Sequence, residues 1–372
     1  MHIKINQSVL SSAAIKIISC AGKKSTLPIL ANFKLEADKN YLKILTSDLE
    51  ITAVAKINCV SLKSGTTTVN AKLFCDLIRE LPDGEINISL EDGERLEITS
   101  ERSKYKLSVV PAEGFPDIKG TDIKTNGRIR AGDLVEMINK TIYAVSFDQT
   151  QLNIGGIGCD YNENNLIFIG TDKNRLSLIS KKADGLKIDR ENLPILPRRV
   201  ASEIKRIVEA VNPDDILGVD IIDGMFIVEG DNFKISAALI NASFIGYSKL
   251  LSAEVGKICS VLSGEISSAI KRASLMATGD DIKVVELEFT KDIINIKGAS
   301  LESGEGFEQV SCKYDGESFR AGFNARYLLD FINPINSDSI VLFELSGEKR
   351  PLKIYPADQK EYLGFIMPMR ND

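Results

Sequence analysis

Three stretches of similar pattern decide how this chain folds: SVLSSAAIKIISCAG (8–22), GDLVEMINKTIYAVS (132–146) and GEISSAIKRASLMAT (264–278). Each has a polar start followed by apolar residues at helical spacing, which predicts an amphipathic helix. The stretches begin 124 and 132 residues apart, close to one third of the 372-residue chain. A fixed spacing of this kind indicates an internal repeat, so we expect three copies of one unit.

Each third also contains a second predicted helix, at 71–81, 198–211 and 324–332. Segments in which Thr, Val and Ile alternate with polar residues surround these helices, as in YLKILTSDLEITAVAKI (41–57), and this alternation predicts half-buried strands. Each third therefore follows the order helix, strands, helix, strands, and the apolar faces of two helices must pack on a sheet. We predict an α+β fold with domains at 1–124, 125–252 and 253–372.

The composition argues against several classes of protein. The chain has no apolar run of about 18 residues for a membrane span and no secretory leader, so we expect a cytoplasmic protein. Six widely separated cysteines without a CxxC pair, and a single histidine, His2, argue against a zinc or redox site. One histidine also argues against Ser-His-Asp and Cys-His catalysis. We expect no metal, no cofactor and no catalytic residue.

The charge pattern is compatible with nucleic-acid binding only if the cations gather on one face of the protein. The net charge is −6, from 46 Lys and Arg against 52 Asp and Glu, so the chain as a whole is not basic. Mixed charge is the ordinary state of a solvated helix face. If all six helices faced one way, however, their cations would form a positive track for a phosphate backbone, independent of sequence and weakened by salt. These cations are Lys16, Lys23, Lys24, Lys72, Arg79, Lys140, Arg198, Arg199, Lys205, Arg206, Lys271, Arg272 and Arg326.

Two alternatives come from other classes of function. A metal-dependent nuclease or hydrolase would use carboxylates such as Asp48, Glu50 or Asp172, but metal-assisted cleavage needs several carboxylates at one point. The spacing supplies no third partner for Asp48 and Glu50, and the TSD and GTD contexts are typical of polar caps between a strand and a turn. A scaffold that binds only proteins is the second alternative, and the residues leave it open.

Motifs along the whole chain resemble those of one family: TLPILANF (26–33), TSDLEI (46–51), GFPDI (114–118), GTDKNRLSL (170–178) and MPMR (367–370). The chain is similar to the bacterial sliding clamps, the beta subunits of the replicative DNA polymerase III. The resemblance implies three similar domains per chain and a head-to-tail homodimer whose six domains close into a ring around duplex DNA. Such a ring has helices lining the hole and sheets outside, and it acts as a processivity factor that tethers the polymerase.

The resemblance gives the cationic helix faces a role, because a ring needs only weak phosphate contacts that average out along the duplex. The predicted DNA-binding residues are Lys24, Lys72, Arg79, Arg198, Arg199, Arg206 and Lys271. For the dimer, a basic edge strand would meet an acidic one, although two unrelated solvated strands would show the same charges. The predicted interface residues are Arg102, Lys104 and Lys106 on one side and Glu302, Glu305 and Glu308 on the other.

Family members also bind short extended peptides of the polymerase alpha subunit, the clamp loader, other polymerases and mismatch-repair proteins. The resemblance places this pocket between the second and third domains, at Ile154, Thr171, Arg175, Leu176, Ile245, Leu250, Phe365, Met367, Pro368, Met369 and Arg370. Methionine adapts to several apolar side chains, and Arg175 and Arg370 are expected to hold a peptide carbonyl or carboxylate at the rim. The sequence departs from the family at Lys173-Asn174, at Ile245 and at 152–156, so the peptide preference stays open.

Overall fold

The computed structural model describes residues 1–22, 27–91, 94–118, 120–148, 150–188, 192–251, 256–277, 283–300, 303–347 and 350–369. Within these residues the elements follow one order three times: a strand, a helix, four strands, a second helix and three strands. The first copy has one additional short strand, and a short helix precedes the third copy. The threefold repeat predicted from the sequence is confirmed.

The first copy consists of β1 (His2–Asn6), α1 (Gln7–Ile17), β2 (Asn32–Asp38), β3 (Tyr41–Ser47), β4 (Ile51–Asn58), β5 (Val60–Lys63), β6 (Gly65–Asn70), α2 (Ala71–Glu80), β7 (Glu85–Glu91), β8 (Arg95–Ser100) and β9 (Ser103–Val110). The second consists of β10 (Gly127–Arg130), α3 (Ala131–Ile142), β11 (Gly156–Asn162), β12 (Asn165–Thr171), β13 (Arg175–Lys182), β14 (Ile195–Pro197), α4 (Arg198–Val208), β15 (Ile216–Ile222), β16 (Met225–Glu229) and β17 (Phe233–Ala238). After α5 (Ser248–Leu251), the third consists of β18 (Lys257–Leu262), α6 (Ser263–Ala273), β19 (Val284–Thr290), β20 (Ile293–Ser300), β21 (Gly304–Ser311), β22 (Phe319–Asn324), α7 (Ala325–Ile332), β23 (Ile340–Leu345), β24 (Leu352–Pro356) and β25 (Tyr362–Ile366).

The six long helices begin within one residue of their predicted starts. In three of them the last residue of the preceding strand is an asparagine, and the side chains of Asn6, Asn70 and Asn324 accept hydrogen bonds from N–H groups of the first turn. Such a cap satisfies donors that have no partner within the helix. The short helix α5 was not predicted, because its four residues are too few for a periodic pattern.

The predicted ends of α1, α3 and α6 lie four or five residues too late. The apolar spacing continues past each helix: Cys20 is buried in the short 3-10 helix Ile18–Cys20 that follows α1, and Ala144 and Ala277 are buried although they lie in a turn and a bend. Burial alone therefore does not mark where a helix ends, because a turn that packs on the core keeps the same spacing of apolar residues.

The density of internal contacts divides the chain into two compact units. The first unit contains residues 1–135, 183–188 and 199–240, and the second contains 136–182, 189–198 and 241–372. The domain boundaries predicted at 124 and 252 stay predictions, and residue 252 lies outside the described residues.

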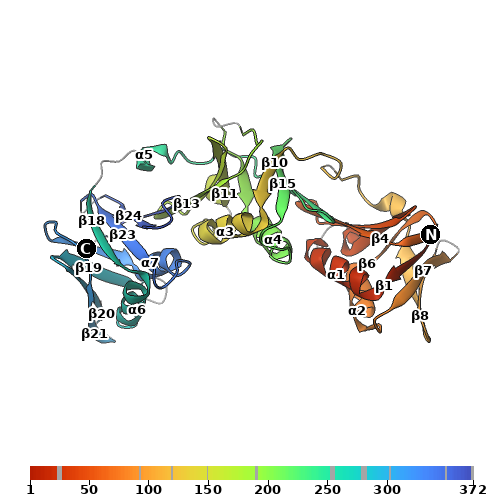
Figure 1. The fold of residues 1–372 in the computed structure, drawn as a ribbon, viewed down its shortest axis with the longest axis horizontal. Helices are drawn as coiled ribbons and strands as arrows, with labels where there is room; N and C mark the ends of the chain where they lie inside the picture. The colour runs from red at the N-terminus through yellow and green to blue at the C-terminus, as the bar shows by residue number, and fades with distance from the viewer. Residues whose placement is uncertain are drawn as a thin grey trace. The chain divides into compact units, whose positions relative to one another are not determined.

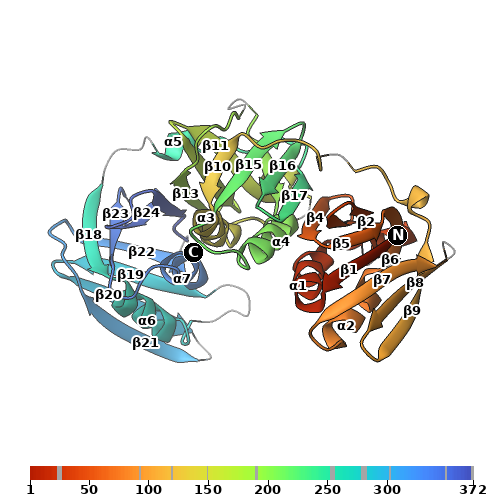
Figure 2. The same cartoon turned by 45° about the vertical axis from the view of Figure 1, so that its right-hand side comes forward.

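In the first unit, α1 and α2 lie against each other and α1 packs on β4 (Figures 1 and 2). The predicted core face of α1 is buried at Leu10, Ala14 and Ile17. Thirteen strands form one sheet in the order β10-β15-β16-β17-β4-β3-β2-β6-β9-β8-β7-β1-β5. Because β17 pairs antiparallel with β4, the backbone hydrogen bonds of this sheet join the second copy to the first.

In the second unit, α6 contacts α7 and packs on β20 and β21. Eight strands form one sheet in the order β14-β11-β12-β13-β25-β24-β23-β18, and four form another in the order β21-β20-β19-β22. The strand β13 of the second copy pairs with β25 of the third, from Arg175 opposite Ile366 to Ile179 opposite Tyr362. The same device, a ladder between strand edges, joins these two copies.

Lys140 on α3 lies inside the second unit, which corrects the expectation that it sits on an outward helix face. The residue is 6% exposed, and its ammonium donates to Glu136 Oε1 at 2.6 Å and to Gln359. The ammonium also lies 4.7 Å from the centre of the Tyr362 ring. The helical spacing placed Lys140 opposite the apolar residues of α3, but Gln359 and Tyr362 of the third copy cover that side.

Glu136 is the acceptor at the centre of this cluster. Besides Lys140, it accepts a hydrogen bond from Gln359 at 2.7 Å and pairs with Lys181 Nζ at 2.8 Å. Burial on its own would raise the pKa of Glu136, but these donors outweigh burial and lower the pKa to about 2. The ionised carboxylate therefore stabilises the folded second unit.

We expect replacement of Glu136 to change how stability depends on pH. Because the folded pKa lies below the ordinary value of 4.5, the stabilisation is fully present above pH 4.5 and is lost as the pH falls towards 2. At pH 6, Glu136→Gln should lower the free energy of unfolding by about 1–2 kcal/mol, an amount reduced for the partial exposure of the carboxylate. Urea unfolding at pH 6 and pH 3 measures the difference, which should shrink at pH 3.

The matched control is Glu163→Gln, at an exposed turn of the same unit. It should change the unfolding free energy equally little at both pH values. If the free energy of unfolding differs between wild type and Glu136→Gln by the same amount at pH 6 and pH 3, the charge of the carboxylate contributes nothing to stability.

Candidate functional site

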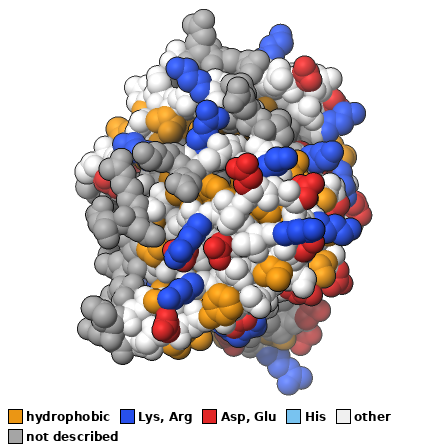
Figure 3. Space-filling model, turned by 90° about the vertical axis from the view of Figure 1, so that its left-hand side faces the viewer, with side chains coloured by type: hydrophobic (Ala, Val, Ile, Leu, Met, Phe, Trp, Pro, Cys, Tyr) orange, Lys and Arg blue, Asp and Glu red, His pale blue; other side chains and the backbone are white. Residues whose placement is uncertain are grey.

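Two of the predicted DNA-binding lysines stand on exposed helix surfaces. Lys72 on α2 and Lys271 on α6 are exposed, and no ion pair joins either of them to another described residue. Arg79 on α2 is also exposed, but it pairs with Asp76 at 3.1 Å. Lys24 lies outside the described residues. Figure 3, which looks onto the third copy, shows Lys and Arg side chains interspersed with Asp and Glu rather than gathered.

Two arginines of α4 bind to the first copy inside the first unit. Arg199 Nη2 lies 2.7 Å from Asp48 Oδ2 and 2.6 Å from Glu50 Oε2. Arg206 Nη2 donates to the carbonyl oxygen of Lys16 at 2.8 Å. Both side chains stay partly exposed, but local carboxylates and carbonyls already occupy several of their donors. Their attraction for a phosphate is therefore weaker than that of a free lysine.

Arg198, the first residue of α4, holds the C-terminal end of α3. Its Nη1 donates to the carbonyl oxygen of Ile142, the last residue of α3, and to that of Val145 in the turn that follows, both at 2.9 Å. The guanidinium lies 3.8 Å from the centre of the Phe147 ring, which is 69% exposed. The sequence pattern identified neither this contact nor Phe147, because no spacing rule marks a lone aromatic in a loop.

Asp48 and Asp172 occupy the same turn in the first and second copies. In each turn the carboxylate Oδ1 accepts the N–H groups of the residues two and three positions later, at 2.9–3.1 Å. The residues after them, Leu49 and Lys173, both have positive φ, 76° and 75°. The interpretation as polar caps is confirmed. Within the described part of the chain, no group of three His, Cys, Asp or Glu side chains is arranged to hold a metal.

Arg175 lies beneath the surface rather than at a rim. Its Nε lies 3.0 Å from Asp172 Oδ2, its Nη1 lies 2.6 Å from Asp330 Oδ2, and its Nη2 donates to the carbonyl of Tyr143 at 2.6 Å. The guanidinium also lies 4.2 Å from the centre of the Tyr327 ring. With its donors engaged, Arg175 fixes the Asp172 turn to α7 and to the end of α3. The rim role predicted for Arg175 does not fit this burial.

The other residues predicted for the peptide pocket divide into a buried and a surface group. Leu176 and Phe365 are paired across β13 and β25 and are buried, as are Ile154 and Thr171. Met367 is 40% exposed, and its N–H donates to the carbonyl of Asn174 at 2.9 Å. The N–H of Met369 donates to Gly322, and Pro368 is half-buried like Met369. The tail thus follows the start of β13 and reaches β22.

Ile245 lies in the segment that leads into α5 and Leu250 lies in α5 itself, and both are half-buried. Tyr247 anchors this segment because its hydroxyl donates to Asp160 on β11 at 2.7 Å. Arg370 lies outside the described residues. The surface group therefore borders β11 and the start of β13, and Met369 reaches β22 of the four-stranded sheet. Leu152, in the loop before β11, adds an exposed apolar side chain that the prediction did not include.

The predicted dimer strands have unpaired edges. The strand β21 is the end of its four-stranded sheet, and β9 pairs with β8 along its length but with β6 only at Val109 and Val110. Each strand carries an exposed aromatic ring, Tyr105 on β9 and Phe307 on β21. An open edge with apolar side chains is a surface on which another strand can pair.

The charges on these strands are arranged differently from the prediction. Lys104 pairs with Glu97 at 2.8 Å and Lys106 with Glu91 at 2.6 Å, so neighbouring strands of the same sheet neutralise them. Arg102 is exposed, and Glu302 lies outside the described residues. Glu305 and Glu308 are three positions apart on β21 and point to opposite sides, towards Lys297 and Arg272. The expected acidic cluster is therefore absent from the described part of β21.

Comparison with known proteins covers the whole chain. The DNA polymerase III beta subunit family matches in three parts, with its N-terminal domain at residues 1–119, its central domain at 128–245 and its C-terminal domain at 248–370. The beta sliding clamp of Vibrio cholerae is 23% identical over 371 residues, with all of both chains covered. That of Escherichia coli K12 is 26% identical, with 94% of each chain covered.

Solved structures agree with these relatives. The DNA polymerase III subunit beta of Pseudomonas aeruginosa has a TM-score of 0.92 at 25% identity, and all of both chains is covered. A beta sliding clamp of Caulobacter crescentus with polyethylene glycol bound at a putative beta-motif tethering region has a TM-score of 0.90 at 25% identity, covering 100% of this chain and 99% of that one.

No described helix is long and apolar enough to cross a membrane. The nuclease or hydrolase alternative gains no support from these relatives, and Arg199 and Arg175 engage the carboxylates that it would use. Three family domains matched in order, a threefold repeat of elements and full-length structural likeness agree. The chain belongs to the DNA polymerase III beta subunit family.

Proposed function

We propose that this chain is the processivity clamp of a replicative polymerase, a ring of two copies that encircles duplex DNA and acts without catalysing a reaction. The observation that carries the proposal is the threefold repeat across the whole chain, matched end to end by sliding clamps. Topological retention needs no tight site, which agrees with helix faces of mixed charge. Family membership also favours the cytoplasm, where the replicative polymerase works.

The DNA contact in this proposal is weak and distributed. Lys72 and Lys271 supply exposed cations for which the described residues form no ion pair. Three arginines, Arg79, Arg199 and Arg206, form ion pairs with carboxylates of the protein, which reduces their attraction for phosphate. Each phosphate contact adds attraction that weakens as salt rises. Many weak contacts allow a ring to move along the duplex, because exchanging one phosphate for the next costs little free energy.

We propose that partner peptides bind to the surface formed by the tail and the start of β13. Exposed Met367, Leu152 and Phe147 give this surface an apolar character, and methionine adapts to different side chains. Arg175 supports this surface from its buried side, because its contacts with Asp172 and Asp330 fix the turn that borders the tail. The polymerase alpha subunit, the clamp loader and repair proteins are the partners that the family suggests.

We propose that the ring closes by strand pairing between β9 of one copy and β21 of the other. Two different edges then meet head to tail. A closed ring forms only if the rotation that relates one copy to the other leads back to the first copy. The exposed rings of Tyr105 and Phe307 supply apolar area at these edges. Electrostatic attraction contributes less than the sequence indicated, because Lys104, Lys106 and Glu305 already have partners in their own sheets.

A topological link to DNA predicts different behaviour on circular and linear molecules. Loaded with its clamp loader and ATP, the protein should stay on a nicked circular plasmid through gel filtration and leave when the plasmid is cut once. The double substitution Lys72→Ala and Lys271→Ala should reduce the salt dependence of DNA association, by a slope of about 1 for each phosphate that the variant no longer binds. Equal retention on both forms, or turnover of labelled DNA with Mg²⁺, would contradict the proposal.

Substitution in the edge strand should separate the two copies. Phe307→Asp places a charge where an aromatic ring is buried on pairing, at both interfaces of the ring. At about 2 kcal/mol for each interface, the dimer dissociation constant should rise by about 10³-fold. Sedimentation should then show a monomer of 40.8 kDa. Val60→Asp on β5, a similarly exposed side chain on another edge, is the control and should leave the dimer intact.

Truncation of the tail methionine should weaken peptide binding. Met367→Ala should raise the dissociation constant of a peptide from the clamp-binding segment of the polymerase about fivefold to tenfold, because the variant buries less apolar surface on binding. Ile222→Ala, on β15 of the first unit, removes a side chain of the same exposure (39% against 40%) and should have no effect. Isothermal titration calorimetry distinguishes the two, and equal affinities for both variants would place the peptide elsewhere.

A further inference from the structure

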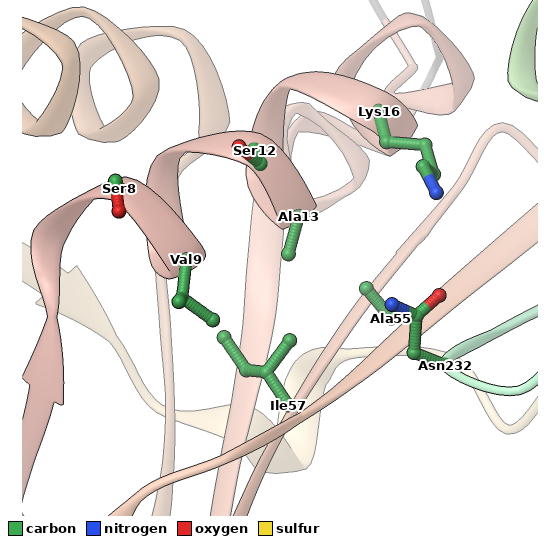
Figure 4. Close-up of a pocket in the computed structure, with 8 residues that line it drawn as sticks. All are labelled: Ser8, Val9, Ser12, Ala13, Lys16, Ala55, Ile57 and Asn232. Atoms are coloured by element: carbon green, nitrogen blue, oxygen red, sulfur yellow. The ribbon is translucent and has the colours of Figure 1, made fainter. Parts of the chain in front are cut away.

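A groove of the first unit takes no part in the surfaces described above. It lies between α1 and β4 and has a volume of about 290 Å³. Five of its lining residues belong to α1 and two to β4, and Asn232 comes from the turn between β16 and β17 (Figure 4). The groove therefore has walls from two copies of the repeat within one compact unit.

The groove has an apolar pair, Val9 and Ile57, at the end where Ser8 also lies, and Lys16, the one cation among its described lining residues, at the other end. Figure 4 shows Val9 opposite Ile57 at one end, and Lys16 with its ammonium directed towards Asn232 at the other. The backbone carbonyl of Asn232 accepts a hydrogen bond from Lys56 N–H at 2.9 Å, which fixes the turn to β4. The polar end is therefore held in place by the same strand that forms the floor.

Lys16 is a cation that lacks a carboxylate in this arrangement. Its ammonium lies 5.2 Å from the centre of the Phe233 ring, and no carboxylate among the described residues lies within ion-pair distance of it. Burial lowers the pKa of Lys16, so the neighbouring protein disfavours its charged form. An anion placed beside this ammonium would be bound more strongly than beside a fully hydrated lysine.

A second cavity, of about 310 Å³, adjoins the groove and shares Lys16 and Asn232 with it. Asp215 and Asp231 line this second cavity, and their carboxylates repel an anion. Of the described residues that line the first groove, Lys16 is the only charged one. An anionic group is therefore favoured on the α1 side of Lys16, next to the apolar end.

We propose that this groove binds an extended peptide segment of a partner protein, with an acidic side chain at Lys16 and an apolar side chain between Val9 and Ile57. An extended segment directs every second side chain to the same side, and we place the two side chains two positions apart, the shortest spacing at which both face the groove. The carboxylate complements the single cation, and the apolar side chain covers Val9, which is exposed in the free protein. This site is separate from the tail surface, which lies in the second unit.

The probes are the peptides Ac-Ala-Leu-Ala-Asp-Ala-NH2 and Ac-Ala-Asp-Ala-Leu-Ala-NH2, which present both directions. Binding to the full-length protein is followed by NMR of the Lys16 side chain, whose pKa should rise when a carboxylate binds. We expect one of the peptides to bind about fivefold more weakly when its Asp is replaced by Asn, as for a single charge-assisted contact.

A double-mutant cycle tests whether the contact is direct. In the Lys16→Met protein, the Asp and Asn peptides should bind with the same affinity, close to that of the Asn peptide for wild type. Val9→Ser should weaken the Leu peptide about threefold and leave a peptide with Ala in place of Leu unaffected. Lys63→Met, which removes an exposed lysine on β5 of the same unit, is the control and should change neither affinity.

Three results would overturn the proposal. Equal affinities of wild type for the Asp and Asn peptides would remove the role of the carboxylate. A fivefold difference that persists in Lys16→Met would move the contact to another cation. A rise in the pKa of Lys16 on addition of a duplex of about 20 base pairs, with no response to either peptide, would make the groove a phosphate contact instead.

Discussion

The pairing of strand edges between successive copies is the interaction on which the rest of the structure depends. A strand at the edge of a sheet has unpaired N–H and C=O groups, and these have to be satisfied by water, by a cover or by another strand. The ladders of β17 with β4 and of β13 with β25 satisfy them by joining one copy to the next. The open edge of β21 and most of the edge of β9 are two of the places where the same chemistry can continue into a second chain, although β5, β10, β14, β18 and β22 also end their sheets.

The parts of the fold that depend on local pattern could be predicted from the sequence. Helix starts were placed within one residue, because a polar cap and the first apolar residues mark them directly. Helix ends and the short α5 were not, because buried turns continue the apolar spacing and four residues show no period. The family resemblance supplied the ring and the partners, which no local pattern in the residues specifies.

The surroundings of individual cations could not be predicted, because they depend on groups that are distant in the sequence. Lys140 is buried because Gln359 and Tyr362 cover α3, and both lie 219 or more residues further on. Arg175 is held by Asp330, and Arg198 by the carbonyls at the end of α3. The planar fork of arginine fits carboxylates and carbonyls in fixed directions, whereas an exposed lysine is well hydrated on its own. In this chain these arginines accordingly hold elements together, while Lys72 and Lys271 stay at the surface.

The turns at Asp48 and Asp172 show how one repeated element connects successive copies in two ways. Both use the same backbone hydrogen bonds and the same positive φ, so the turn itself needs only one carboxylate oxygen. The turn's backbone hydrogen bonds do not use the second oxygen, which can therefore pair with a side chain. In the first copy it pairs with Arg199 of the next copy and strengthens a junction, whereas in the second it orients Arg175, which reaches α7. A duplicated turn therefore fixes the geometry, and in both copies the arginine that pairs with its second oxygen connects one copy to the next.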